Sequence, residues 1–172
     1  VLPDLPTALN AASLPWRTSG FAQWFAQTNF SHDGYAAAQS GYVPNSYGPN
    51  NYVSTLQTTV TGPGTLTFWW NFSPLTTPYA NTLSVSSSLG NASTSVNSTT
   101  GWEQRSLYLG DGEQTVTWTY SRYRFISAPS TGYVDQVSFA PGATKPTVTF
   151  MTPDTYVRAN TTVGLSVNAF GT

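Results

Sequence analysis

The sequence predicts an all-β protein whose antiparallel strands form two sheets packed face to face. Apolar and polar residues alternate along most of the chain, turn-forming segments separate the alternating runs, and helical periodicity is nearly absent. Because successive side chains of a strand point to opposite faces, this alternation gives each strand one buried row and one solvated row. Many short strands of this type, joined by turns, are typical of a β-sandwich.

Two short stretches near the N-terminus have a composition compatible with helix. They are DLPTALNAA, which begins at Asp4, and GYAAAQ, which begins at Gly34. Each is long enough for only a turn or two of helix.

The strongest strand signal is TLTFWWNF, residues 65–72. Its alternation places Trp70 in the core and Trp69 on the opposite, hydroxyl-rich face together with Asn71. Further alternating runs are NTLSVSSSLG, EQTVTWTY and YVDQVSF. The apolar rows of all these runs form the expected core: Leu66, Phe68, Phe72, Leu83, Val85, Val116, Trp118, Tyr120, Val137 and Phe139.

Turn-forming segments separate these runs: TGPG at 61–64, GDGE at 110–113 and APSTG at 128–132. The run WEQRSLYLGDGEQTVTWTY is expected to form a hairpin turning at its Asp-Gly pair, since such a pair readily adopts positive φ angles. That register gives Glu103 and Arg105 the inward parity of the neighbouring leucines. Because buried unpaired charges are costly, either the two residues pair near the end of the sheet or a bulge changes the phase.

The character of the chain changes near residue 140. Residues 1–140 are expected to form the sandwich, and residues 141–146 have the composition of a linker. Residues 147–172 contain two strand-like runs, Thr147–Met151 and Thr161–Ala169, which form a short C-terminal two-strand extension. Two strands are too few for an independent domain, so the extension either pairs with a neighbouring subunit or is the stump of a longer protein.

The composition excludes several classes of function. Charged residues make up 8% of the chain, where about 25% is usual, and the formal net charge is -1. No cluster of positive charge is available to bind nucleic acid, and no apolar run is long enough for membrane insertion. The chain has no cysteine and therefore no disulfide or thiolate metal site. Few lysines, no thiols and many hydroxyls indicate an extracellular or cell-surface protein.

Enzymatic activity is not expected. His32 is the only histidine, no Gly-x-Ser-x-Gly motif is present, and the carboxylates offer no pair suited to glycoside hydrolysis. Asp33 in SHDG and Asp135 in GYVDQ are weak candidates for a structural Ca²⁺ site. The favoured alternative is that Asp33 caps the turn at Gly34 and Asp135 accepts hydrogen bonds inside the sandwich, so that no cofactor is bound.

Several motifs together resemble a known family. WRTSGFAQWFAQTNFSHDGYAAAQSG, TGPGTLTFWW, WEQRSLYLGDGEQTVTWTY and GYVDQVSF are similar, in order and spacing over about residues 8–140, to concanavalin-like, MAM-related jelly-roll modules of large secreted bacterial proteins. The resemblance implies a jelly-roll sandwich and a non-catalytic module. The chain departs from the family at Tyr133, where tryptophan is usual, and in the insertion YVPNSYGPNNY. Residues 147–172 resemble the start of a bacterial Ig-like repeat.

Aromatic residues are the strongest sign of a binding function. Trp69 beside Asn71 offers a ring bordered by hydroxyl and amide groups, which suits stacking on a sugar. The alternative is that a loop or the second sheet covers Trp69. The remaining ligand-binding candidates are Tyr123, Arg122 and Arg124 in YSRYRF and Tyr47 in the tyrosine-rich insertion, whose tyrosines otherwise form a protein contact or pack the loop itself.

Two classes of function follow from these observations. The first is an extracellular binding or adhesion module that recognises a glycan or cell-surface polymer through exposed aromatic residues. The second is a structural subunit of an extracellular filament or surface assembly, in which residues 147–169 pair with a neighbouring subunit. The exposure of Trp69 and the contacts of residues 147–169 distinguish the two.

Overall fold

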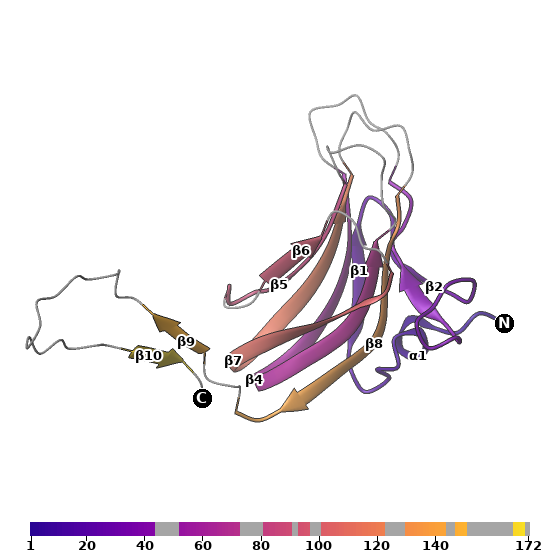
Figure 1. Ribbon diagram of the computed structural model, residues 1–172. Helices are drawn as coiled ribbons and strands as arrows, with labels where there is room; N and C mark the ends of the chain where they lie inside the picture. The colour runs from indigo at the N-terminus through magenta and orange to yellow at the C-terminus, as the bar shows by residue number, and fades with distance from the viewer. Residues whose placement is uncertain are drawn as a thin grey trace, which may run out of the picture.

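The computed structural model describes residues 1–43, 52–72, 81–90, 93–96, 101–122 and 130–143, and the backbone of 147–150 and 167–170. In these residues the chain is almost entirely antiparallel β-structure, which confirms the predicted fold class (Figure 1). The elements in chain order are α1 (Leu5–Ala8), β1 (Trp16–Gly20), β2 (Phe25–Gln27), β3 (Ala37–Gln39), β4 (Val53–Phe72), β5 (Thr82–Ser87), β6 (Ser93–Val96), β7 (Glu103–Ser121), β8 (Gly132–Pro141), β9 (Thr147–Phe150) and β10 (Val167–Phe170).

The two layers of the sandwich are parts of one continuous eight-stranded sheet. Its strand order is β2, β3, β8, β4, β7, β5, β6, and β1 also pairs with β4. The first layer contains β1, β5, β6, residues 53–62 of β4 and residues 112–121 of β7. The second layer contains β2, β3, β8 and the other halves of β4 and β7. Figure 1 shows β4 and β7 lying side by side and curving together.

The long pair of β4 and β7 corrects the turn predictions. Neither TGPG nor GDGE ends a strand, and the hairpin predicted at Asp111 and Gly112 is wrong, because β7 runs through this segment and pairs with β4 on both sides of it. The two segments lie opposite each other, with Gly62 facing Gly112 and a register shift before Gly64. Both strands therefore bend at the same place and carry their ladder of hydrogen bonds from one layer into the other.

Close packing at this bend depends on the absence of side chains. A Cβ on Gly62 would lie 2.1 Å from the carbonyl oxygen of Gly110, and a Cβ on Gly64 would lie 2.5 Å from the ring of Phe139. The fully buried Gln114 side chain donates from Nε2 to the same Gly110 oxygen at 2.8 Å. The Gly110 carbonyl at the bend is thus hydrogen-bonded inside the protein.

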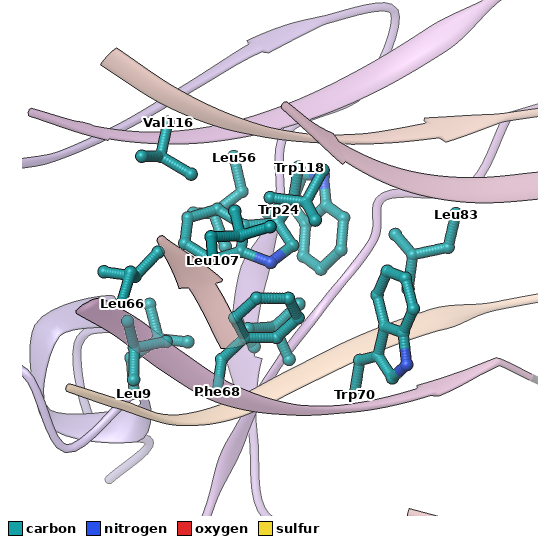
Figure 2. Packing of buried hydrophobic residues seen from close by; sticks show 14 of the residues in the cluster. Leu9, Trp24, Leu56, Leu66, Phe68, Trp70, Leu83, Leu107, Val116 and Trp118 are labelled. Carbon is teal, nitrogen blue, oxygen red and sulfur yellow. The ribbon is translucent and has the colours of Figure 1, made fainter. Parts of the chain in front are cut away.

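The core lies between the two layers and contains the apolar row expected from the alternation. Figure 2 shows Phe68 and Trp70 of the second layer pointing into the core, Phe68 toward Trp118 and Trp70 toward Leu83 of the first layer. The Phe68 ring lies edge-on to both indoles, with centroid distances of 5.5 Å to Trp70 and 5.3 Å to Trp118. Each of these side chains is fully buried, which stabilises the fold by about 1.5–3 kcal/mol per residue.

Glu103 and Arg105 lie at the edge of the second layer. Residues 103–109 of β7 pair with β4 on one side only in the described sheet. Arg105 and Glu103 form an ion pair of 2.5 Å there, and the Arg105 guanidinium lies 5.5 Å from the centre of the Trp70 ring. Of the two alternatives left open by the sequence, the first is realised: Glu103 and Arg105 keep the inward parity of Leu107 and Leu109 and pair with each other near the end of the sheet.

The two helix predictions have different outcomes. DLPTALNAA forms α1, as predicted, and Asp4 caps this helix by accepting a hydrogen bond from the Thr7 N–H at 3.0 Å. The helix predicted in GYAAAQ is wrong, because Ala37–Gln39 forms β3 between β2 and β8. Ala37 and Ala38 are fully buried in this strand, so small side chains are required by packing and not by helix propensity.

The C-terminal extension forms a separate sheet. β9 and β10 pair with each other in antiparallel register, from Thr147 opposite Phe170 to Phe150 opposite Val167. In the described residues neither strand pairs with the sandwich. No helix in the described parts of the chain is long and apolar enough to cross a membrane.

The bend predicts a large effect of a small substitution. Gly62→Ala should lower the free energy of unfolding by about 2–4 kcal/mol, because the added methyl group forces the facing backbone apart. Gly101→Ala is the control, since a Cβ there meets no atom within 4 Å, and it should change stability by less than about 0.5 kcal/mol. Equal urea midpoints for the two variants would contradict this account of the bend.

Candidate functional site

Trp69 lies on the outer face of the second layer, as the alternation of the sequence predicts. It is half-buried, whereas its neighbour Trp70 is fully buried in the core. The imidazole of His32 stacks on the Trp69 indole with the ring centroids 3.7 Å apart and the planes 14° from parallel. The segment around His32 therefore covers one face of Trp69, as the alternative interpretation of the sequence anticipated.

Other rings extend this stack into a larger group on the same outer face. Phe30 stacks on Trp102 with centroids 5.2 Å apart, and it meets Tyr133 edge-on at 4.9 Å. Trp102 lies edge-on to His32 at 6.0 Å, which joins the two stacks. We call this group the outer aromatic cluster: Phe30, His32, Trp69, Trp102 and Tyr133. Phe30 is 41% exposed and the other four rings are half-buried, so the cluster is a surface and not a second core.

Strand pairing explains why distant residues meet here. Asn71 of β4 lies opposite Tyr133 of β8, and Trp69 lies opposite Asp135 of β8 and Gln104 of β7. Trp102 immediately precedes β7 and has the parity of the exposed Gln104. Three neighbouring strands thus bring aromatic and amide side chains to one end of the same face.

Buried polar groups anchor the segment that carries Phe30 and His32. Gln27 accepts hydrogen bonds at Oε1 from the N–H groups of Asn29 and Phe30, at 2.7 and 2.9 Å, and donates from Nε2 to the Phe30 carbonyl. Asp135 accepts at Oδ2 from the His32 N–H at 2.7 Å and from the Asp33 N–H at 3.3 Å. His32 Nδ1 also lies 2.7 Å from Gln136 Oε1. The rings are therefore held in place before any ligand arrives.

Asp135 has the hydrogen-bonding role that the sequence suggests, but in a different place. It lies on the outer side of the sheet, beneath the segment 30–33, and not inside the sandwich. The cause is a register shift in β8 between the partners of Thr67 and Trp69, where Gln136 has a positive φ of 48°. The bulge reverses the parity that links Asp135 to Val137 in the sequence pattern.

Burial is the main cause of the raised pKa of Asp135, and the nearby Asp33 carboxylate raises it further, against the hydrogen bonds from His32, Asp33 and Gln136. Asp33 is exposed and behaves differently. Partial desolvation raises its pKa, but donors from Tyr35, Asn10 and Ala36 outweigh this effect and lower it overall. Asp33 accepts from the Tyr35 N–H at 2.7 Å, next to Gly34 at a φ of 80°, which is the turn-capping role expected for it.

The carboxylate oxygens of both aspartates therefore accept hydrogen bonds from donors within the protein. Among the described residues, no group of three or more His, Cys, Asp or Glu side chains is arranged to hold a metal ion. Asp33 and Asp135 alone would supply a weak Ca²⁺ site, because calcium takes six to eight oxygen ligands.

The other candidate ligand-binding residues have three different outcomes. Asn71 lies on the same face as the cluster, opposite Tyr133, but its relative exposure is only 8%. Arg122 is 4% exposed, donates to the Val43 carbonyl at 2.5 Å and lies 5.7 Å from the centre of the Tyr42 ring. The structure places Arg122 in the interior, apart from Trp69. Tyr47, Tyr123 and Arg124 lie outside the described residues.

Sequence reasoning missed most members of the cluster. Trp102, Phe30 and Tyr133 were not identified as partners of Trp69, because the strand pairing that joins them was not known. One signal was present: Trp102 has the outward parity of Gln104, Ser106 and Tyr108 along β7. Correct pairing of β7 with β4 would have placed Trp102 beside Asn71.

Comparison with known proteins identifies the architecture. No protein-family model matches the chain, and no curated protein matches it by sequence. The K3 adhesin domain of Lys-gingipain from Porphyromonas gingivalis matches with a TM-score of 0.55 and 18% identity, covering 83% of this chain and 98% of that one. The K2 adhesin domain of the same protein matches with a TM-score of 0.51 and 14% identity, covering 74% and 89%.

A third solved structure describes the promiscuous specificity of carbohydrate-binding modules from the β-sandwich superfamily. It matches with a TM-score of 0.51 and 13% identity, covering 81% of this chain. The match spans only 61% of that structure's length, less than two thirds. These similarities show that the chain has the fold of jelly-roll-like β-sandwich modules.

The buried Asp135 predicts a pH dependence of stability. Because its pKa is raised above the ordinary 3.8, the folded state holds a proton that the unfolded state releases. The contribution of Asp135 to stability should therefore fall as pH rises from about 3.8 through the raised pKa, by at most about 1.4 kcal/mol per pH unit. Urea unfolding of the wild type and Asp135→Asn across this range measures the difference.

Asp111→Asn removes an exposed carboxylate at the bend and is the control for a general change in charge. The stability difference between the wild type and Asp135→Asn should shrink or reverse with rising pH, and Asp111→Asn should show no such trend. A difference that grows with pH would mean that the buried site favours the ionised carboxylate.

Proposed function

We propose that the chain is a non-catalytic, extracellular glycan-binding or adhesion module whose binding surface is the outer aromatic cluster. The single observation that carries this proposal is the gathering of partly exposed rings and amide groups on one outer face of the sandwich. The concanavalin-like assignment of residues 8–140 and the Ig-like assignment of residues 147–172 are part of the same proposal.

The chemistry of the cluster suits a sugar ring. A pyranose has apolar C–H faces that pack on aromatic rings and a rim of hydroxyls that needs hydrogen-bonding partners. Phe30, Trp102 and Tyr133 supply exposed ring area, and Gln104 and Gln136 supply amide groups next to it. Trp69 is covered on one face by His32, so it supports the cluster from below and contributes less of the ring area that would contact a sugar.

The low charge of the cluster also favours a neutral ligand. Asp135 is buried and occupied by backbone donors, so the exposed polar groups near the rings are mainly amides and hydroxyls. Asp33, next to His32, is exposed, and its oxygens accept hydrogen bonds from Tyr35, Ala36 and Asn10, so a neutral polysaccharide meets little unsatisfied charge on this surface. Solved structures with this fold include carbohydrate-binding modules and adhesin domains, which supports a binding role over catalysis.

Retention on polysaccharides tests the proposal. The wild type should be retarded in affinity gels that contain a neutral polysaccharide from a panel of xylan, β-glucan, mannan and soluble cellulose derivatives. Trp102→Ala and Phe30→Ala should each weaken retention by about tenfold or more, because each removes a ring from the sugar-stacking surface.

Tyr108→Ala is the matched control. Tyr108 is 44% exposed on the outer side of β7, and it belongs to no ring contact of the cluster. Its loss should leave retention unchanged, and near-ultraviolet circular dichroism verifies that all three variants are folded. Unchanged retention of Trp102→Ala and Phe30→Ala, or failure of the wild type to bind any polymer of the panel, would sink the proposal.

Pairing of the C-terminal strands with a neighbouring subunit is the second candidate function. It is favoured by one observation: in the described residues β9 and β10 pair only with each other, and isolated two-stranded sheets are marginally stable. An exposed strand edge is a template for a strand from another chain.

Removal of residues 141–172 tests strand pairing separately from glycan binding. The full chain should form concentration-dependent oligomers in sedimentation velocity, and the shortened chain should remain monomeric and still bind the polysaccharide. Identical sedimentation of both chains would leave no role for β9 and β10 in assembly.

A further inference from the structure

The outer face of the first layer has a chemistry quite different from that of the aromatic cluster. Alternation along β4, β5 and β7 turns their apolar rows inward and leaves short polar side chains outside. Cross-strand pairs align these residues in rows, for example Thr55 opposite Thr119 and Gln57 opposite Thr117. We call this surface the hydroxyl face; its members are Ser19, Thr55, Gln57, Thr59, Ser84, Ser86, Ser95, Thr115, Thr117 and Thr119.

A groove of about 310 Å³ opens on this face, at the edge formed by β1. It is lined by Pro15, Arg17, Gln57, Thr58, Thr59 and Thr115. Thr58 forms part of its floor, since it is buried and its Oγ1 donates to the Pro15 carbonyl at 2.8 Å. The volume is at the lower end of the range for small-molecule sites, which suits a short segment of a polymer.

Arg17 is the charged group of the groove. It lies opposite Gln57 on the edge strand β1, its side chain is exposed, and in the described part of the chain it forms no ion pair. Glu113 is the carboxylate of β7 closest in sequence to the groove; it faces Thr61, one row beyond Thr115, and does not line the groove. The groove therefore presents an uncompensated positive charge among neutral groups.

The neighbours of Arg17 supply hydrogen bonds without adding charge. Gln57 donates from Nε2 to Thr117 Oγ1 at 3.1 Å, which orients the amide, and its Oε1 is a hydrogen-bond acceptor. Thr59 and Thr115 add hydroxyls that can both donate and accept. A guanidinium beside neutral amides and hydroxyls is complementary to one carboxylate surrounded by alcohols.

We propose that this groove is a second binding site, separate from the aromatic cluster, that takes one uronic acid unit of an acidic polysaccharide. The fork of Arg17 binds the sugar carboxylate in bidentate geometry, and Gln57, Thr59 and Thr115 bind the ring hydroxyls. The hydroxyl face continues the groove, so adjacent sugars of the polymer lie along it. This site does not depend on the function proposed for the cluster.

Polygalacturonate and its fully methyl-esterified form are the probes, because they share one backbone and differ in the charge of the carboxyl group. In calcium-free buffer, affinity gels and titration calorimetry should show that the wild type binds polygalacturonate and binds the ester at least about tenfold more weakly. Added salt should weaken the binding of polygalacturonate, since the pair is exposed to solvent.

Arg17→Gln removes the charge and keeps hydrogen-bonding groups, whereas Arg17→Lys keeps the charge and loses the fork. The first variant should lower the affinity for polygalacturonate by about tenfold or more, and the second should lie between it and the wild type. Thr59→Val removes a hydroxyl at nearly constant volume and should cause a smaller loss. Arg17 is exposed on an edge strand, so equal urea midpoints should verify that these variants fold normally.

Two variants distinguish the two sites. Trp102→Ala should still bind polygalacturonate, and Arg17→Gln should still bind any neutral glycan that the wild type binds. Equal binding of acid and ester, full affinity in Arg17→Gln, loss of polygalacturonate binding in Trp102→Ala, or no binding of polygalacturonate by the wild type would each overturn the assignment.

Discussion

The ladder shared by β4 and β7 is the constraint on which the rest of the structure depends. These strands pair from Val53 and Ser121 at one end to Trp70 and Glu103 at the other, and they bend together where Gly62 faces Gly112. A single strand that bends alone would lose its hydrogen bonds at the corner, whereas two paired strands that bend together keep most of them. The same ladder thus runs through both layers, in the middle of the first and along one edge of the second.

This arrangement also determines what each outer face carries. β4 contributes alternate side chains to the core along its whole length, so its remaining residues form the outer row of the first layer and then of the second. The row is Thr55, Gln57 and Thr59 before the bend and Thr65, Thr67 and Trp69 after it. One strand therefore leads from a hydroxyl face to an aromatic cluster. Stability depends on the inner row, which leaves both outer rows available for binding.

Polar groups beneath the aromatic cluster anchor the segment that carries Phe30 and His32. Asp135 and Gln27 both use buried oxygens to hold the backbone of the segment that carries Phe30 and His32. His32 then stacks on Trp69 and reaches Gln136. A surface fixed in this way loses little conformational entropy when it binds a ligand. This anchoring has a cost in folding free energy when Asp135 is ionised, because burial disfavours the charged form and raises its pKa.

The sequence allowed the fold class and the inner row to be predicted, because period-two alternation is a local property of each strand. The opposite placement of Trp69 and Trp70 followed from the same rule. Strand pairing did not follow. An Asp-Gly pair is a strong turn signal, yet in β7 it lies at a bend that is stabilised by the facing strand, a tertiary effect invisible in the local pattern. Asp135 was predicted on the inner face of the sheet but lies on the outer face, because a bulge at Gln136 reverses the alternation.

The candidate site was predictable only in part. Trp69 was identified from parity alone, but its cover by His32 involves residues 37 positions apart in the chain and depends on hydrogen bonds to β8. Trp102, Phe30 and Tyr133 join it through the pairing of three strands. The indole N–H resonances of the tryptophans test the central claim most directly, during titration with gluco-, xylo- and manno-oligosaccharides. The account predicts that Trp102 and Trp69 shift while the buried Trp24, Trp70 and Trp118 do not; shifts confined to residues outside the cluster, or none at all, would contradict it.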